Sequence, residues 1–190
     1  MKDKTLIAIT GGIGSGKSYA LDLINKRGYK TLSCDTALNE VYQDKNALQD
    51  IKNTFPNVFD GDILNRKKLS EVVFNDKTLL NKLNSITHPR ILEIVISQAK
   101  QSEDTIIFIE VPLLFEGNFQ TLFNKVLVIK RDINSRIESV KKRSNLSEDE
   151  ILKRMRSQID YDNYDFNGYD VIINDNLFED KINNYLKELI

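Results

Sequence analysis

The sequence predicts an α/β protein with a mostly parallel β-sheet and helices on both faces. Two observations predict this fold. Five apolar or β-branched runs, each bounded by polar residues, are separated by longer segments with helical periodicity. The first run also leads through a glycine-rich turn directly into an amphipathic helical pattern. Strands that alternate with helices form parallel βαβ units with right-handed crossovers, and their ligands bind at the carboxyl ends of the strands.

The predicted strands are short and are spread along the whole chain. They are Thr5–Thr10, Tyr29–Leu32, Thr105–Val111, Val126–Ile129 and Val171–Ile173. Apolar residues at helical spacing occupy most of the residues between them, which favours helices as the connections.

The interval from Tyr42 to Gln101 interrupts this alternation. It contains helical patterns at Leu79–Ile86 and Ile91–Val95 and a loop at Phe55–Asp62, but no strand pattern. We therefore expect a helical subdomain of residues 45–101, inserted into a core made of residues 1–44 and 102–190.

A second break lies at Ser144–Asp149, between two basic helical stretches. Leu146 and Ser147 there are typical of a loop followed by a helix N-cap, because a serine side chain can accept a hydrogen bond from an N–H of the first turn. We expect residues 134–160 to form a helical lid.

Residues Gly11–Ser18 match the phosphate-binding motif G-x-x-x-x-G-K-[S/T] in its proper context of strand, loop and helix. Glycines let successive backbone N–H groups turn toward a polyanion, and the following helix directs its positive dipole end there. The alternative, a plain glycine-rich turn, accounts for less of the pattern. A dinucleotide-binding motif is excluded because Lys17 or Tyr19 would stand where its third glycine belongs.

The fold is therefore predicted to be of the phosphate-loop NTPase type. Lys17 is expected to reach the outer phosphates, and the Ser18 hydroxyl is expected to hold Mg²⁺, which accompanies ATP. The complete set of residues expected to bind ATP is Gly12, Ile13, Gly14, Ser15, Gly16, Lys17 and Ser18.

Composition limits the other classes of function. The chain has 190 residues, of which 41% are hydrophobic and 29% charged, ordinary values for a globular protein. Its net charge of −1 argues against a nucleic-acid or membrane-surface partner. No apolar stretch approaches the length of a membrane span, and the first residues lead into a strand and not into a signal peptide. A single cysteine, Cys34, and the lack of a Cys/His cluster exclude an intramolecular disulfide and a zinc site. We expect a cytoplasmic protein; the sequence carries no signal of an oligomeric state.

Two carboxylates follow predicted strands, where ligands of such sheets bind. Asp35 follows the second strand, a position that suits a base for an acceptor hydroxyl; the alternative is a helix N-cap. Glu110 ends the buried strand 105–110, as in the strand that helps to hold Mg²⁺ in these proteins.

Cationic side chains are expected near the transferring phosphate, because phosphoryl transfer needs the negative charge on the phosphate oxygens to be offset. Residues 125–156 hold ten Lys and Arg against five Asp and Glu, and they include Arg136, Arg143 and Arg154. An arginine fork matches phosphate oxygens, whereas the alternative is a solvated helix face. The only histidine, His88, precedes a proline and is interpreted from the sequence as structural, not as a metal ligand.

Further motifs extend the pattern beyond a phosphate-binding loop. In chain order they are Thr10–Ser18, Asp35, Leu64–Arg66, Leu83–Asn84, His88–Pro89, Val111–Glu116, Arg154 with Gln158, and Val171–Ile172 with Asn174. In order and spacing, over nearly the whole chain, they resemble the dephospho-CoA kinase family.

The resemblance implies a phosphate-loop core, a helical acceptor domain that binds the CoA moiety, and a lid. It implies phosphorylation of the ribose 3′-hydroxyl of dephospho-CoA by MgATP, with Asp35 as the catalytic base and Lys17 and Arg143 as further catalytic residues. Arg143 would be a lid arginine, with Arg154 and Gln158 nearby. Arg66, His88 and Arg90 would lie on the acceptor side.

The chain departs from the family pattern at a few positions. Ser33 stands where the family often has an acid, Ser139 stands where it often has a lid arginine, and Gly168-Tyr169 replaces an Ala-Asp pair. None of these positions belongs to the phosphate-binding loop.

Two other functions remain open at this stage. One is a kinase for another small acceptor, such as a nucleoside monophosphate or shikimate. The other is a nucleotide-dependent switch protein, which the sequence disfavours because none of its Asn-Lys pairs continues as Asn-Lys-x-Asp.

Overall fold

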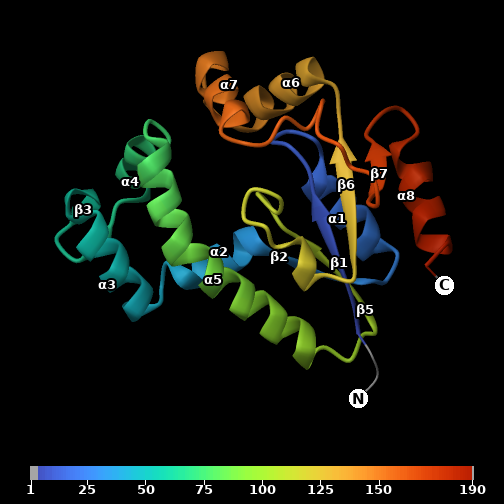
Figure 1. Ribbon diagram of the computed structural model, residues 1–190, viewed down its shortest axis with the longest axis horizontal. Coiled ribbons are helices and arrows are strands. Elements are labelled where there is room, and N and C mark those ends of the chain that lie inside the picture. The colour runs from blue at the N-terminus through green and yellow to red at the C-terminus, as the bar shows by residue number, and fades with distance from the viewer. Residues whose placement is uncertain (1–3, 190) are drawn as a thin grey trace. The chain divides into compact units, whose positions relative to one another are not determined.

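A computed structural model describes residues 4–189, which form two compact units (Figure 1). The helical unit is Cys34–Gln98, and the sheet unit comprises the described residues up to Ser33 and from Ala99 onward. These boundaries lie at 33/34 and 98/99, whereas the predicted boundaries lie at 44/45 and 101/102. No helix among residues 4–189 is both long enough and apolar enough to cross a bilayer.

The sheet unit contains a five-stranded, all-parallel sheet in the order β2-β5-β1-β6-β7. Its strands are β1 Thr5–Thr10, β2 Lys30–Ser33, β5 Ile106–Glu110, β6 Lys125–Lys130 and β7 Asp170–Ile173. Each bound lies within one residue of the sequence prediction. The predicted α/β fold with a parallel sheet is therefore confirmed.

Strand β1 lies at the centre of the sheet, between β5 and β6. The register aligns Ile9 of β1 and Ser33 of β2 with Glu110, the last residue of β5. The connections that leave β1 and β5 lead to opposite sides of the sheet, to β2 and to β6, so the chain reverses direction between these two adjacent strands, whose carboxyl ends meet. In open α/β sheets this reversal point is where ligands bind.

Helices α1 (Lys17–Lys26) and α8 (Phe178–Lys187) contact each other and pack on the sheet (Figure 1). Burying each large apolar side chain in such a layer contributes roughly 1.5–3 kcal/mol. The layer therefore holds α1, and with it the loop that precedes α1, against β1. The buried residues of this layer are Ile7, Ile9, Ala20, Leu23, Ile24, Phe108, Leu127, Ile129, Ile172, Phe178, Ile182 and Leu186.

Helices α6 (Ile133–Arg143) and α7 (Glu148–Arg156) of the sheet unit contact each other and occupy the predicted lid region. Ser147 caps α7 in a capping box with Glu150, so the predicted N-cap is confirmed. A 3₁₀ turn, η2 (Gln120–Leu122), precedes β6.

The helical unit has its own apolar core. Its elements are α2 Cys34–Val41, α3 Lys45–Thr54, the 3₁₀ turn η1 Pro56–Val58, β3 Phe59–Asp60, β4 Ile63–Leu64, α4 Arg66–Val73 and α5 Lys77–Gln101, of which residues 99–101 belong to the sheet unit. The buried residues of its core are Ile51, Phe55, Val58, Leu69, Val73 and Leu83.

One expectation for this segment, the absence of strands, needs correction. The predicted loop at Phe55–Asp62 contains η1 and the first strand of a short antiparallel hairpin, β3–β4, whose turn has Gly61 at a φ of 66°. Two-residue strands are too short for an alternating pattern to be visible. The two helical patterns at Leu79–Ile86 and Ile91–Val95 belong to one helix, α5, which continues through Pro89.

Candidate phosphate-binding site

The loop between β1 and α1 has the backbone that its glycines predict. Gly14 and Gly16 have φ values of 78° and 101°, in a region that favours glycine. Gly16 is the N-cap of α1, and the first N–H groups of an α-helix receive no partner from the helix itself. The loop therefore ends at a helix N-terminus, where backbone donors and the helix dipole favour a bound anion.

Neighbouring side chains approach the loop too closely for larger residues. A Cβ on Gly12 would lie 2.3 Å from Nη2 of Arg136, and a Cβ on Gly16 would lie 2.2 Å from Nδ2 of Asn174. A larger residue at either position would displace one of these side chains, and the φ of Gly16 by itself favours glycine.

Several loop carbonyls accept hydrogen bonds from side chains. Nε of Arg136 donates to the Ile13 carbonyl (3.0 Å), and Nδ2 of Asn174 donates to the Ser15 carbonyl (2.8 Å). Nζ of Lys17 donates to the carbonyls of Gly11 (2.9 Å) and Gly12 (3.3 Å). Because C=O and N–H point in opposite directions across a trans peptide, these bonds fix the directions of the N–H groups that follow.

The backbone N–H of Ile13 donates to Oε1 of Gln158 (2.8 Å), which follows α7. Ile13 is therefore held through both its N–H and its carbonyl by side chains of the lid region, Gln158 and Arg136.

Ser18 and Glu110 meet beside the loop. The Ser18 hydroxyl donates to Oε1 of Glu110 at 3.0 Å, and Glu110 is 4% exposed. Hydroxyl and carboxylate oxygens are ligands that Mg²⁺ accepts. Among the described residues no group of three or more His, Cys, Asp and Glu could hold a metal ion. Two oxygen ligands are enough for a kinase Mg²⁺ site, because the ion takes few ligands from the protein and completes its coordination shell with phosphate oxygens and water.

Asp35 lies in the first turn of α2 and is exposed. Because α2 begins at Cys34, Asp35 is inside the helix and is not its N-cap. The carboxyl end of β2 precedes it by two residues, but Asp35 itself belongs to the helical unit. Its role as a base stays a prediction.

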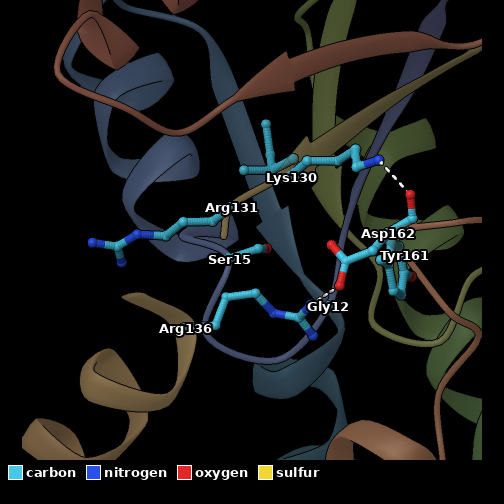
Figure 2. A pocket seen from close by; sticks show the side chains of 8 residues that line it. Gly12, Ser15, Lys130, Arg131, Arg136, Tyr161 and Asp162 are labelled. Atoms are coloured by element: carbon cyan, nitrogen blue, oxygen red, sulfur yellow. Dashed lines mark hydrogen bonds and ion pairs between the residues drawn. The ribbon is translucent and has the colours of Figure 1, made fainter. Parts of the chain in front are cut away.

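The three candidate arginines have different surroundings (Figure 2 shows Arg136). Arg136 of α6 is 5% exposed, and burial lowers the pKa of its guanidinium while the charge of Asp162 opposes that shift. Arg143 is exposed at the end of α6. Arg154 of α7 is half-buried; burial lowers its pKa, and the charge of Glu150 opposes that shift.

The residues predicted to bind the acceptor all lie in the helical unit. Arg66 donates through Nη1 to Oδ1 of Asn39 (2.7 Å), and its guanidinium carbon lies 4.7 Å from the ring centroid of Tyr42. Arg90 pairs with Asp50 at 2.5 Å. Arg90 also donates to a carbonyl of its own helix, α5.

His88 is half-buried in α5, and burial lowers its pKa. The neutral imidazole is therefore its stable form near pH 7.

The segment that follows α7 is attached to the sheet unit by aromatic and polar contacts. The ring of Phe115 lies 5.2–5.4 Å from the rings of Tyr164, Phe166 and Tyr169. Oε1 of the neighbouring Glu116 accepts a hydrogen bond from a backbone N–H of this segment, that of Ile159 (2.9 Å). The Val111–Glu116 motif thus helps to position Gln158.

A tyrosine joins the same segment to the end of β1. The hydroxyls of Tyr161 and Thr10 lie 3.3 Å apart. Burial raises the pKa of Tyr161, and the charge of Glu116 adds to that shift. The tyrosine therefore stays protonated and can act as a hydrogen-bond donor.

No role at the site was predicted for Asn174 or Tyr161, and the contact of Arg136 with the loop was not predicted either. Asn174 directly follows β7, so the strand-end rule that selected Glu110 could have found it. Tyr161 follows no strand end and no pattern in the sequence distinguishes it, whereas Arg136 was a candidate only through the basic charge of residues 125–156.

Comparisons with protein families and with curated proteins identify the same family. A family model described as Dephospho-CoA kinase matches residues 5–180. A dephospho-CoA kinase from Lactobacillus acidophilus is 36% identical over 160 residues, which cover 81% of this chain and 80% of the relative. One from Thermus thermophilus is 32% identical over 158 residues, covering 83% and 77%.

Solved structures resemble this chain over nearly its whole length. A crystal structure of a Thermus thermophilus protein superposes with a TM-score of 0.85 at 31% identity, covering 99% of this chain and 97% of that chain. A dephospho-CoA kinase from Campylobacter jejuni gives a TM-score of 0.69 at 28% identity, covering 98% and 97%. A shikimate kinase from Acinetobacter baumannii, at 11% identity and a TM-score of 0.58, shares the fold alone.

Proposed function

The chain belongs to the dephospho-CoA kinase family and is an ATP-dependent kinase, and on this premise we propose how its residues perform the transfer. The substrates are ATP and dephospho-CoA, and the products are ADP and coenzyme A. The observation that carries this proposal is the family match over residues 5–180. The fold would not be enough, because a shikimate kinase shares it. Family membership does not favour the other two functions, a different acceptor or a nucleotide switch.

In the proposed reaction the ribose 3′-hydroxyl oxygen of dephospho-CoA attacks the γ-phosphorus of ATP. A new P–O bond forms at that oxygen, and the bond between the γ-phosphorus and the β,γ-bridging oxygen breaks. ADP leaves with the electron pair of that bond. The hydroxyl proton passes to the carboxylate of Asp35, which orients the hydroxyl before transfer.

The phosphate-binding loop binds the polyphosphate through backbone N–H groups between Ile13 and Ser18 and through Lys17. The Ile13 N–H would first have to release Gln158, and the Ser15 N–H would have to release the Gly12 carbonyl. What supports this is the bonding of the Ile13 and Ser15 carbonyls to Arg136 and Asn174, which directs the N–H groups of Gly14 and Gly16 away from those two side chains. Lys17 exchanges its carbonyl partners for phosphate oxygens when ATP binds. Fixed donors of this kind stabilise charge that develops on the transferring group without a cost of reorganisation.

Ser18 and Glu110 would hold Mg²⁺, the first as a ligand and the second directly or through water. Bound there, the ion would neutralise charge on the β- and γ-phosphates. What supports this assignment is the 3.0 Å contact between the two side chains at the start of α1.

The helical unit would bind the acceptor, with Arg66, His88 and Arg90 on that side. Arg66 supports this best, because Asn39 and Tyr42 already hold its guanidinium in one orientation. A preoriented arginine loses less freedom when it binds phosphate, and dephospho-CoA carries a diphosphate. Arg143 would stabilise charge on the phosphates from the lid. A cytoplasmic location stays a prediction.

The test is a transfer assay with purified protein, ATP and Mg²⁺. Dephospho-CoA, AMP and shikimate are offered separately, and the products are identified by mass spectrometry. Rapid transfer to dephospho-CoA alone is expected, and the Lys17→Ala variant should be nearly inactive with every acceptor. Faster transfer to AMP or shikimate than to dephospho-CoA would contradict the proposal.

A further inference from the structure

Arg136 is an unusual arginine because it is buried. It lies in the first turn of α6 and is 5% exposed, although a guanidinium in a protein interior loses its hydration. An ion pair offsets only part of this lost hydration, because Nη1 of Arg136 and Oδ2 of Asp162 are 3.9 Å apart and the Asp162 side chain is half exposed. The strongest contact of the guanidinium is therefore not a carboxylate.

That contact is the backbone of the phosphate-binding loop. Nε of Arg136 donates to the Ile13 carbonyl at 3.0 Å. The guanidinium also lies against Gly12, and the backbone of Arg136 lies against Gly14, where an added Cβ would meet the Arg136 carbonyl oxygen at 2.5 Å. Figure 2 shows the side chain extending from α6 toward Gly12, beside Ser15.

The hydrogen bond to the Ile13 carbonyl also sets the direction of the Gly14 N–H. The Ile13 carbonyl shares its peptide group with the N–H of Gly14, and the two point in opposite directions. A donor that holds the carbonyl toward α6 thereby holds the Gly14 N–H away from α6. Gly14 has a φ of 78°, so this peptide would otherwise have the wide rotational freedom of a glycine.

We infer that Arg136 is a positioning residue for the phosphate-binding loop: through Nε it fixes the Ile13–Gly14 peptide so that the Gly14 N–H faces the phosphates of the nucleotide. The inference rests on the proposed binding of ATP at this loop. It assigns the effect to the hydrogen bond made by Nε and not to the positive charge.

Substitutions at position 136 can separate the bond from the charge. In Arg136→Gln, the amide Nε2 occupies the place of Nε in the side chain, so the donor is kept and the charge is lost. In Arg136→Lys, the charge is kept but a methylene group occupies that place. Arg136→Met removes both. A matched control is Arg27→Met, because Arg27 also donates through Nε, to Oδ1 of Asn183 at 2.8 Å, but at the far end of α1.

The experiment measures binding of the β,γ-imido analogue of ATP by calorimetry, together with KM for each substrate. We expect Arg136→Gln to bind within about threefold of the unsubstituted protein, and Arg136→Lys and Arg136→Met to bind about tenfold or more weakly. KM for ATP should follow the same order, while KM for dephospho-CoA stays unchanged. Arg27→Met should match the unsubstituted protein.

Other outcomes would overturn the inference. Tight binding by Arg136→Lys with weak binding by Arg136→Gln would assign the effect to charge. Equal weakening in all three variants, with lowered melting temperatures and a raised KM for both substrates, would show a purely structural role. Failure of the unsubstituted protein itself to bind the analogue would instead overturn the proposed function.

Discussion

The hydroxyl of Ser18 donates a 3.0 Å hydrogen bond to Oε1 of Glu110, a carboxylate 92 positions further along the chain. Parallel pairing of β1 with β5 produces this contact, because it aligns Ile9 with Glu110 at the edge from which the phosphate-binding loop leaves the sheet. The first residue of the proposed metal site is thus local to the loop, and the second is supplied by the sheet.

Removal of the Ser18 hydroxyl should weaken the use of Mg²⁺. In Ser18→Ala we expect the Mg²⁺ concentration for half-maximal activity to rise about tenfold or more, since one oxygen ligand is lost. Glu110→Gln should act in the same direction because it loses a charge near the ion. Ser18→Thr keeps the hydroxyl and serves as the control. An unchanged Mg²⁺ dependence in both Ser18→Ala and Glu110→Gln would contradict the site.

Asp35→Asn keeps the shape of the side chain but removes the base. We expect kcat to fall about 100-fold or more while KM for dephospho-CoA changes little, because general base catalysis contributes to the transition state and not to substrate binding. Glu40→Gln makes the same carboxylate-to-amide change on α2 and should remain active. If kcat of Asp35→Asn stayed within about threefold, the assignment of the base would be wrong.

Arg66→Ala should weaken binding of the acceptor and leave binding of the nucleotide unchanged. Loss of a charge-assisted contact with phosphate is expected to raise KM for dephospho-CoA about tenfold, with KM for ATP nearly unchanged. The neighbouring exposed Lys67 provides a control in Lys67→Ala. A similar rise in both KM values for Arg66→Ala would indicate a folding defect or a wrong assignment.

Arg143 should act only when the lid has closed over the phosphates. Arg143→Lys keeps the charge but loses the planar fork, so we expect kcat to fall about tenfold. Limited proteolysis tests the closure: cleavage between α6 and α7, at residues 144–147, should be rapid without ligand and slow with a bisubstrate analogue. Equal cleavage in both states, with full activity of Arg143→Lys, would leave these cations as a solvated helix face.

His88 should make stability depend on pH near neutrality. Burial lowers its pKa in the folded protein below the ordinary value of 6.5, so the unfolded chain takes up the proton first on acidification. The free energy of unfolding should therefore fall as the pH drops below about 7, and this loss should level off below the folded pKa. His88→Gln should flatten the dependence between pH 7 and about 5.5, as His88 is the only histidine. Denaturant unfolding at a series of pH values measures this, and an identical slope in both proteins would refute it.

The features that the sequence predicted well depend on residues close together in the chain. The five strands, the phosphate-binding loop and the N-cap at Ser147 each follow from a local periodicity, a contiguous motif or a capping residue next to the helix it caps. Lys17 and Ser18 were assigned roles for the same reason, because both lie within the motif itself. The β3–β4 hairpin was missed because its strands have two residues each and show no period.

The contacts that complete the phosphate-binding site join distant residues, and only the tertiary structure decided them. Arg136 reaches Ile13 across 123 positions of the sequence, and Asn174 reaches Ser15 across 159. The strand order β2-β5-β1-β6-β7 brings the ends of β6 and β7 to the same side of β1. A hydrophobic period indicates that a segment is a strand but carries no information on which strand lies beside it, because every buried parallel strand presents a similar apolar surface. Pairing is settled by packing of the whole chain, and that packing determines which side chains hold the loop.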